Sequence, residues 1–297
     1  MVDFVISENL HARLNEADWL KDSCDSMRLD VDGSVSASFC MSPQSIRFVE
    51  RVSKMSTHAV VINELVKAYS TGLKAIDGVT LAVDEGEIFG LIGPNGAGKT
   101  TTLRILGALL KPTSGKVTVL GHDVVQEQMT VRGLISYLPE DAGAYENLSG
   151  REYLAFMAGF YEGDAKKTVD IGVRIADLKE RIDSRIKEYS KGMKRRLLIA
   201  RALMTAPKLA ILDEPTAGLD VMHALYVRER VKGLIKERGT TAVLSSHNLL
   251  EVEFMCDRVA LIDHGRIHEI GTPSELKGKY GAQNLEEVFM EVVKHAA

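Results

Sequence analysis

The stretch "GPNGAGKT", residues 93–100, follows the apolar run "IFGLI" and precedes the helical run "TTLRILGALL". It matches the G-x-x-x-x-G-K-T pattern of a phosphate-binding loop placed between a strand and a helix. Gly93, Gly96 and Gly98 let the backbone curl so that its N–H groups face phosphate oxygens, and the helix dipole adds positive potential there. A chance glycine turn would need neither the strand nor the helix. The stretch therefore predicts a nucleotide site in an α/β protein.

A second stretch, "LAILDEP" at residues 209–215, supplies two carboxylates for the same site. Its apolar residues predict a buried strand whose end carries Asp213 and Glu214. In the loop, Lys99 is expected to reach the β- and γ-phosphates, and the Thr100 hydroxyl to bind Mg²⁺. Asp213 is expected to hold Mg²⁺ through water, and Glu214 to orient and deprotonate the attacking water. An Asp-Glu pair alone is common in turns, but following a phosphate loop it predicts the second half of a nucleotide site.

The composition is that of an ordinary soluble globular chain with one or two domains. It has 297 residues, 45% hydrophobic and 26% charged, with a formal net charge of -4. That charge disfavours a protein that grips nucleic acid by bulk electrostatics. Cys24, Cys40 and Cys256 lack zinc-site spacing and disulfide density, which predicts a reducing cytoplasm. Because no apolar run reaches the roughly 18 residues of a membrane span, any membrane attachment is expected to come from another protein.

Two parts of the chain differ in the periodicity of their apolar residues. Residues 1–58 show no sustained periodicity and are predicted to be a poorly ordered extension, with Met55 a candidate for the true translation start. From Val60 onward, short apolar runs predict strands and the segments between them predict helices. The capping box "TPSE" at residues 272–275 predicts the start of a C-terminal helical tail over 272–297. Helices are expected over 99–110, 150–161, 192–205 and 221–237.

These motifs, in this order, resemble the ATPase subunit of an ABC transporter. "GPNGAGKT" corresponds to the Walker A loop, "LAILDEP" to Walker B, and "AGLD", ending at Asp220, to the D-loop. "SSHNLLEVE" carries the family's switch histidine at His247, and Tyr69 matches the aromatic residue that stacks on adenine. "YSKGMKRRL" stands in place of the family's signature sequence, at the start of a helix. Ser190 is a good N-cap there and Gly192 allows close backbone approach.

The resemblance implies a P-loop NTPase fold of the ABC ATPase type over residues 59–293. It has a mixed α/β sheet core, an antiparallel β subdomain and an α-helical subdomain inserted at about 140–205. It also implies that two subunits clamp two nucleotides head to tail, each site being completed by Ser190 and Gly192 of the other subunit, with Asp220 linking the sites. The implied catalytic residues are Glu214, His247 and Lys99, and the implied Mg²⁺ ligands are Thr100, Asp213 and Glu140. The implied ATP-binding residues are Tyr69, Gly93, Pro94, Asn95, Gly96, Ala97, Gly98, Lys99, Thr100, Thr101, Glu140, Ser190, Gly192 and Asp220.

Some positions depart from the family pattern. Tyr189, Lys191 and Met193 replace the signature Leu, Gly and Gln, and Glu140 stands where the family has its Q-loop glutamine. These substitutions resemble those of the branch that exports drugs, antibiotics and sodium. The resemblance thus implies an ATP-hydrolysing subunit, peripheral on the cytoplasmic face of the membrane. It would power solute export through a separate permease, with a second ATPase subunit and without binding nucleic acid.

Other interpretations stay open. One alternative is a soluble ABC ATPase, such as an Fe–S assembly scaffold, which would move no solute. Another is a regulatory subunit that binds ATP without hydrolysing it. The presence of Glu214 and His247 argues against this second alternative. The basic residues within 191–196 are expected partly on a solvated helix face and partly against acidic neighbours, rather than in a nuclear signal. Tyr145 is a candidate contact for the permease. Tyr153, Phe156 and Phe160, spaced 3 and 4 apart, are better explained as the core of the helical subdomain.

Overall fold

The computed structural model describes residues 27–29, 35–37 and 58–296. The chain divides into two units, Met1–Ser56 and Thr57–Ala297. In the first unit, β1 (Met27–Leu29) and β2 (Val35–Ala37) pair as antiparallel strands. Apart from these two strands, the predicted N-terminal extension and the candidate start at Met55 lie outside the described residues and stay predictions.

The core of the second unit is a six-stranded mixed sheet in the order β12-β11-β5-β10-β9-β8. The pairs from β11 to β8 are parallel, and β12 pairs with β11 in the antiparallel sense. The strands are β5 (Ile88–Ile92), β8 (Ile135–Leu138), β9 (Leu209–Asp213), β10 (Thr241–Ser246), β11 (Arg258–Asp263) and β12 (Arg266–Gly271).

Both faces of the five parallel strands are largely buried, as the near-continuous apolar runs predicted. In β9, Ala210 and Leu212 join the apolar cluster that includes α8 and α9, whereas Leu209 and Ile211 join the cluster that includes α3. Successive side chains of a strand point to opposite faces, so one short apolar run serves two cores.

A second, antiparallel sheet has the order β4-β3-β6-β7. Its strands are β3 (His58–Ala68), β4 (Lys74–Asp84), β6 (Ser114–Val119) and β7 (His122–Asp123). Its apolar side chains pack in one cluster with those of α3 and the adjoining face of the central sheet. This arrangement confirms the predicted α/β fold with an antiparallel β subdomain.

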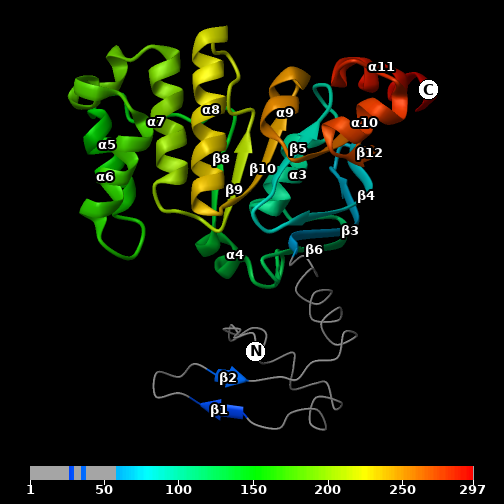
Figure 1. Cartoon of the computed structure of the whole chain (residues 1–297), viewed down its shortest axis with the longest axis horizontal. Helices are drawn as coiled ribbons and strands as arrows, with labels where there is room; N and C mark the ends of the chain where they lie inside the picture. The colour runs from blue at the N-terminus through cyan, green and yellow to red at the C-terminus, as the bar shows by residue number, and fades with distance from the viewer. Residues whose placement is uncertain (1–26, 30–34, 38–57, 297) are drawn as a thin grey trace. The chain divides into compact units, whose positions relative to one another are not determined.

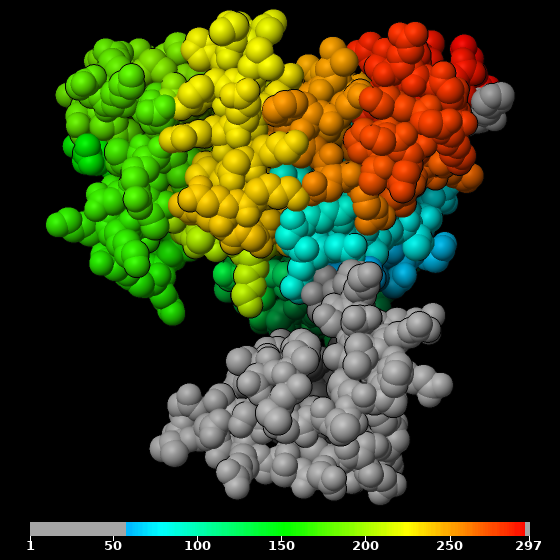
Figure 2. Space-filling model, viewed as in Figure 1, coloured from blue at the N-terminus to red at the C-terminus, as the bar shows by residue number. Residues whose placement is uncertain are grey.

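The helices cover the sheets and build a separate helical lobe (Figure 1). They are α3 (Lys99–Leu106), α4 (Gln128–Leu134), α5 (Gly150–Ala158), α6 (Ala165–Ala176), α7 (Lys191–Leu203), α8 (Val221–Arg238), α9 (Leu249–Met255), α10 (Pro273–Tyr280) and α11 (Leu285–Ala296). In Figure 2, the green lobe of α5 to α7 lies beside the yellow α8, and the red C-terminal helices lie at the opposite end of this unit.

Most helix starts were predicted more accurately from the sequence than the helix ends. Helix α10 begins with the predicted capping box of Thr272 and Glu275, with Pro273 in its first turn. Helix α3 ends at Leu106 and helix α5 at Ala158, both earlier than predicted. Gly107 and Gly159 follow these helices directly, and glycine favours a helix end over a helix interior.

The aromatic residues in α5 and just after it do not all belong to the core. Tyr153 is buried, but Phe156 and Phe160 expose 46% and 69% of their surface. The core face of α5 is filled by Tyr153, Leu154 and Ala158. The prediction that all three aromatic residues form the core is therefore wrong for Phe156 and Phe160.

A bilayer span is absent from the described part of the chain, where no helix is both long and apolar enough to cross a membrane.

Gly115→Ala is expected to destabilise the β subdomain by about 3 kcal/mol, measured by urea unfolding, because a left-handed conformation and a steric clash add up there. The residue has φ +89°, and a Cβ would lie 2.4 Å from the Glu64 carbonyl oxygen. Gly121 is a matched control, since it has φ +83° and no atom within 4 Å of a Cβ. Gly121→Ala should cost only about 1 kcal/mol. Equal losses in the two variants would contradict the steric explanation.

Candidate nucleotide-binding site

The phosphate loop joins the end of β5 to the start of α3, and its glycines sit against backbone. A Cβ on Gly93 would lie 2.0 Å from the Ile262 carbonyl oxygen, and one on Gly98 would lie 2.4 Å from that of Ala75. Gly98 also has φ +102° and is the N-cap of α3. The loop can therefore take this shape only with glycine at both positions.

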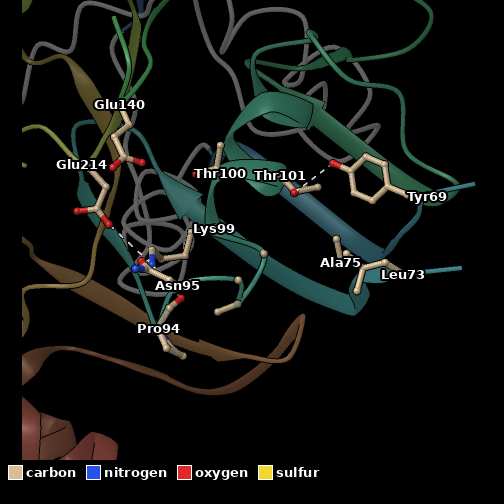
Figure 3. A pocket seen from close by; sticks show the side chains of 13 residues that line it. Tyr69, Leu73, Ala75, Pro94, Asn95, Lys99, Thr100, Thr101, Glu140 and Glu214 are labelled. Carbon is tan, nitrogen blue, oxygen red and sulfur yellow. Dashed lines mark hydrogen bonds and ion pairs between the residues drawn. The ribbon is translucent and has the colours of Figure 1, made fainter. Parts of the chain in front are cut away.

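A cavity of about 400 Å³ opens over this loop. Figure 3 shows Tyr69 at one end of it and the carboxylates of Glu140 and Glu214 at the other. The lining residues are Tyr69, Leu73, Ala75, Pro94, Asn95, Gly96, Ala97, Gly98, Lys99, Thr100, Thr101, Glu140 and Glu214. Most of the predicted ATP-binding residues are thus brought to one cavity.

Lys99 is held back against its own loop. Its Nζ donates to the carbonyl oxygens of Gly93 at 2.6 Å and Pro94 at 3.1 Å. The same nitrogen lies 3.8 Å from Glu214 Oε1. Burial lowers the pKa of Lys99, and the carboxylates of Glu214, Asp213 and Glu140 oppose that shift. The site therefore holds a buried cation beside several carboxylates, ready to pair with an anion.

Asp213, at the end of β9, is the most enclosed of these carboxylates, with 1% exposure. Its Oδ1 accepts from Ser245 Oγ at 2.5 Å and Thr100 Oγ1 at 3.2 Å. The Tyr137 hydroxyl approaches Oδ2 at 3.4 Å, and burial is the largest cause that raises the Tyr137 pKa to about 12. Because Thr100 and Asp213 lie this close, their oxygens can be offered together to one hard cation.

Glu214 follows in a conformation that non-glycine residues rarely adopt, with φ +47°. Its N–H donates to Ser245 Oγ at 3.0 Å. Its Oε2 lies 2.9 Å from His247 Nδ1, while the His247 side chain stays 55% exposed. The strained backbone turns this carboxylate toward both the cavity and the histidine.

Tyr69 meets the other end of the phosphate loop. Its hydroxyl lies 3.4 Å from Thr101 Oγ1, and Lys67 Nζ lies 5.3 Å from the centre of its ring. Tyr69 exposes 36% of its surface, which leaves a face of its ring available for stacking on a base.

The predicted signature and D-loop residues do not line this cavity. Ser190 caps α7, and its Oγ accepts from Met193 N at 3.2 Å. Asp220 caps α8 and pairs with His223 Nδ1 at 2.7 Å. A Cβ on Gly192 would lie 2.8 Å from His223 Cδ2, so the imidazole connects the starts of α7 and α8.

The basic run after Ser190 has three different environments. Lys194 pairs with Glu146 at 2.6 Å, which confirms an acidic neighbour. Arg196 donates to the Ala176 carbonyl and stacks on Tyr226, with 4.4 Å from its guanidinium carbon to the ring centre. Arg195 is only 6% exposed and contacts backbone carbonyls, so the predicted solvated or acid-paired setting is wrong for this residue.

The sequence interpretation missed Ser245 and Tyr137, both of which approach Asp213. Ser245 could have been found, since it is the next-to-last residue of the apolar run "TAVLSS", two residues before His247. A hydroxyl in an otherwise apolar buried strand requires a hydrogen-bond partner. Tyr137 gives no such local signal.

Comparisons with known proteins agree with this geometry. The family model described as "ABC transporter" matches residues 76–217. The daunorubicin/doxorubicin resistance ATP-binding protein of Streptomyces peucetius is 41% identical over 77% of this chain and 70% of its own length. The linearmycin resistance ATP-binding protein of Bacillus subtilis is 38% identical over 77% of this chain and 74% of its own length. These relatives agree with the predicted exporter branch.

A solved structure supports the same assignment. A dimeric ATP-binding cassette in a post-hydrolysis state, bound to ADP and Pi, superposes with a TM-score of 0.65. It is 27% identical and covers 72% of this chain and 98% of its own. The chain therefore belongs to the ABC transporter family, as an ATP-binding subunit that hydrolyses ATP.

Proposed function

We propose that this chain powers export of a solute through a separate membrane permease, by hydrolysing ATP at sites completed by two ATPase subunits. The observation that carries the proposal is the alignment of Lys99, Glu214 and His247. Glu214 lies 3.8 Å from the Lys99 ammonium and 2.9 Å from the His247 ring. A base and a cation thus face one cavity beside a phosphate loop, and a second donor contacts the base.

The residues have distinct roles in this proposal. Lys99 exchanges its loop carbonyls for phosphate oxygens, and the ring of Tyr69 stacks on adenine. Glu214 takes a proton from water as the water oxygen attacks the γ-phosphorus and the bond to the bridging oxygen breaks. His247 donates to the γ-phosphate. These groups stabilise charge that grows in the transition state.

The oxygens of Thr100, Asp213 and Glu140 fit a magnesium ion. Hard divalent cations prefer carboxylate and hydroxyl oxygens, and Thr100 Oγ1 already lies 3.2 Å from Asp213 Oδ1. When bound, the ion supplies positive charge against the phosphates and offsets the extra negative charge of Glu140.

The second subunit enters because the start of α7, an anion-binding element, does not line the cavity of its own chain. Helix α7 begins at Lys191, with Ser190 as its cap and Gly192 in its first turn. Free N–H groups at such a helix end attract an anion. We propose that this anion is the γ-phosphate on the partner, and that Asp220 links the two sites. The dimeric state of the similar cassette supports this arrangement.

Export and the permease partner are supported by the relatives and by one surface. Both relatives are named for drug resistance, which supports a drug or antibiotic as the solute class. On the helical lobe, Tyr145, Phe156 and Phe160 form an aromatic row. Their rings meet edge to face at 5.3 Å and 5.2 Å, and all three are exposed. We propose that this row contacts the permease and keeps the chain on the cytoplasmic face of the membrane.

Glu214→Gln is expected to lower kcat for ATP hydrolysis by about 100-fold or more, because the amide cannot take the proton. Binding of ATP, measured by equilibrium dialysis, should persist. The isosteric control is Glu237→Gln on the exposed end of α8, which should keep full turnover. Near-normal phosphate release by Glu214→Gln would reject Glu214 as the base.

Ser190→Asp should abolish the ATP-dependent dimer while leaving the fold intact. Aspartate caps helices as well as serine does, but it adds negative charge where an anion is expected to bind. The variant is made in a Glu214→Gln background and examined by analytical ultracentrifugation with Mg-ATP. Ser190→Thr in the same background keeps the cap without charge and should dimerise. A Ser190→Asp protein that still dimerises would count against the shared site.

The double variant Phe156→Ser, Phe160→Ser should reduce the membrane-bound fraction in native cells by about tenfold, because losing two aromatic anchors costs about 1.4 kcal/mol or more. Basal ATPase activity of the purified protein should not change. Met129→Ser on α4 is the control, since Met129 is 77% exposed and lies on a different helix. Unchanged membrane association of the double variant would exclude this row as the contact.

A further inference from the structure

Arg195 lies on α7, one turn after the residue that caps the helix, and its guanidinium is enclosed. All three of its nitrogens donate to backbone carbonyl oxygens. Nε donates to Pro215 at 2.7 Å, Nη1 donates to Glu140 at 3.2 Å and Pro139 at 3.4 Å, and Nη2 donates to Glu214 at 2.6 Å and Asp213 at 2.9 Å. One side chain thus binds the two backbone segments that carry the carboxylates of the nucleotide site.

Those two segments lie at the ends of β8 and β9. Strands β8 and β9 are parallel neighbours whose last register pair is Leu138 with Leu212. Beyond this pair the two strands have no further register pair with each other, so the carbonyls that follow need other donors. Arg195 supplies donors to both chains from one rigid plane. A lysine could not do so, because its donors radiate from a single nitrogen.

The environment is suited to a cation even without a direct carboxylate partner. Burial lowers the pKa of Arg195, while the negative charges of Asp213 and Glu140 oppose that shift. The carbonyl of Glu214 is one of its acceptors, and Glu214 itself holds φ +47°. Arg195 therefore stabilises a backbone conformation that is unfavourable in isolation.

We propose that Arg195 is a positioning residue that fixes Glu140 and Glu214 relative to each other and ties both to the helix that carries Ser190. This inference rests on the proposed function, in which Glu214 activates water and Glu140 faces the metal. Arg195 itself touches neither substrate nor metal. Its loss should leave ATP able to bind but the carboxylates displaced.

The neighbouring Arg196 provides a matched control. It also belongs to α7 and also donates to backbone carbonyls, those of Ala176 and Asp177. These carbonyls lie at the end of helix α6 and not in the loops of the nucleotide site. Replacing either arginine by lysine removes the planar group and keeps the positive charge. A difference between the two variants then reports which loops the guanidinium holds.

The experiment compares Arg195→Lys, Arg195→Gln and Arg196→Lys with the full wild-type chain. It measures kcat, KM for ATP, the Mg²⁺ concentration for half-maximal activity, and the thermal midpoint. For Arg195→Lys we expect kcat to fall about 30-fold with KM changed by less than about threefold, because a small displacement of catalytic groups costs rate rather than binding. The Mg²⁺ requirement should rise several-fold. Arg196→Lys should keep kcat within about twofold, even where its thermal midpoint falls.

Each outcome decides the question. Wild-type kcat and Mg²⁺ dependence in Arg195→Lys, or equal losses in the Arg195 and Arg196 variants, would overturn the proposal. If neither Arg195 variant folds while Arg196→Lys does, Arg195 is a folding residue, and the positioning role is equally rejected. Glu214→Gln is measured alongside: full turnover there would reject the proposed function, whereas loss there with normal Arg195→Lys would reject only this inference.

Discussion

A buried carboxylate must be supplied with hydrogen-bond donors, and Asp213, which is 1% exposed at the end of β9, has this requirement. Its donors come from three different elements: Thr100 at the start of α3, Ser245 on β10 and Tyr137 on β8. The strand order β10-β9-β8 is what brings them together. The phosphate loop, the Thr100 hydroxyl proposed to bind magnesium, and Glu214 all lie around this one side chain.

Arg195 does for the backbone beyond β8 and β9 what the three hydroxyls do for the Asp213 side chain. The two arrangements are complementary, since one gathers donors around a carboxylate and the other gathers carbonyls around a cation. Both depend on residues that are distant in sequence. The helical lobe is therefore joined to the sheet by hydrogen bonds at the nucleotide site, as well as by apolar packing along α7 and α8.

Much of the fold could be predicted from the sequence because its signals are local. The phosphate loop, the apolar runs of β5, β9 and β10, and the capping box at Thr272 each specify their own structure. The long strands β3 and β4 were not predicted. Register shifts interrupt the alternation in β3, whereas residues 79–84 of β4 alternate regularly and carried a strand signal that was overlooked. The outward position of Phe156 and Phe160 was also missed, because the buried face of α5 follows Gly150, Leu154 and Ala158 and Phe160 lies beyond the end of the helix.

In the site, too, local signals were predicted and long-range contacts were not. Loop and carboxylate residues were found because motif and position coincide, and most of them line one cavity. The buried state of Arg195 could not be predicted, because its acceptors are backbone carbonyls and no residue type encodes them. A run of basic residues has the same sequence pattern whether its side chains face water, a carboxylate or the main chain.

The imidazole of His223 lies against the bare backbone of Gly192, with its other edge on Asp220. A side chain at position 192 would therefore require the imidazole to turn toward solvent, away from Asp220. A change at one position thus affects the contact of a residue that lies 31 positions away in the printed sequence.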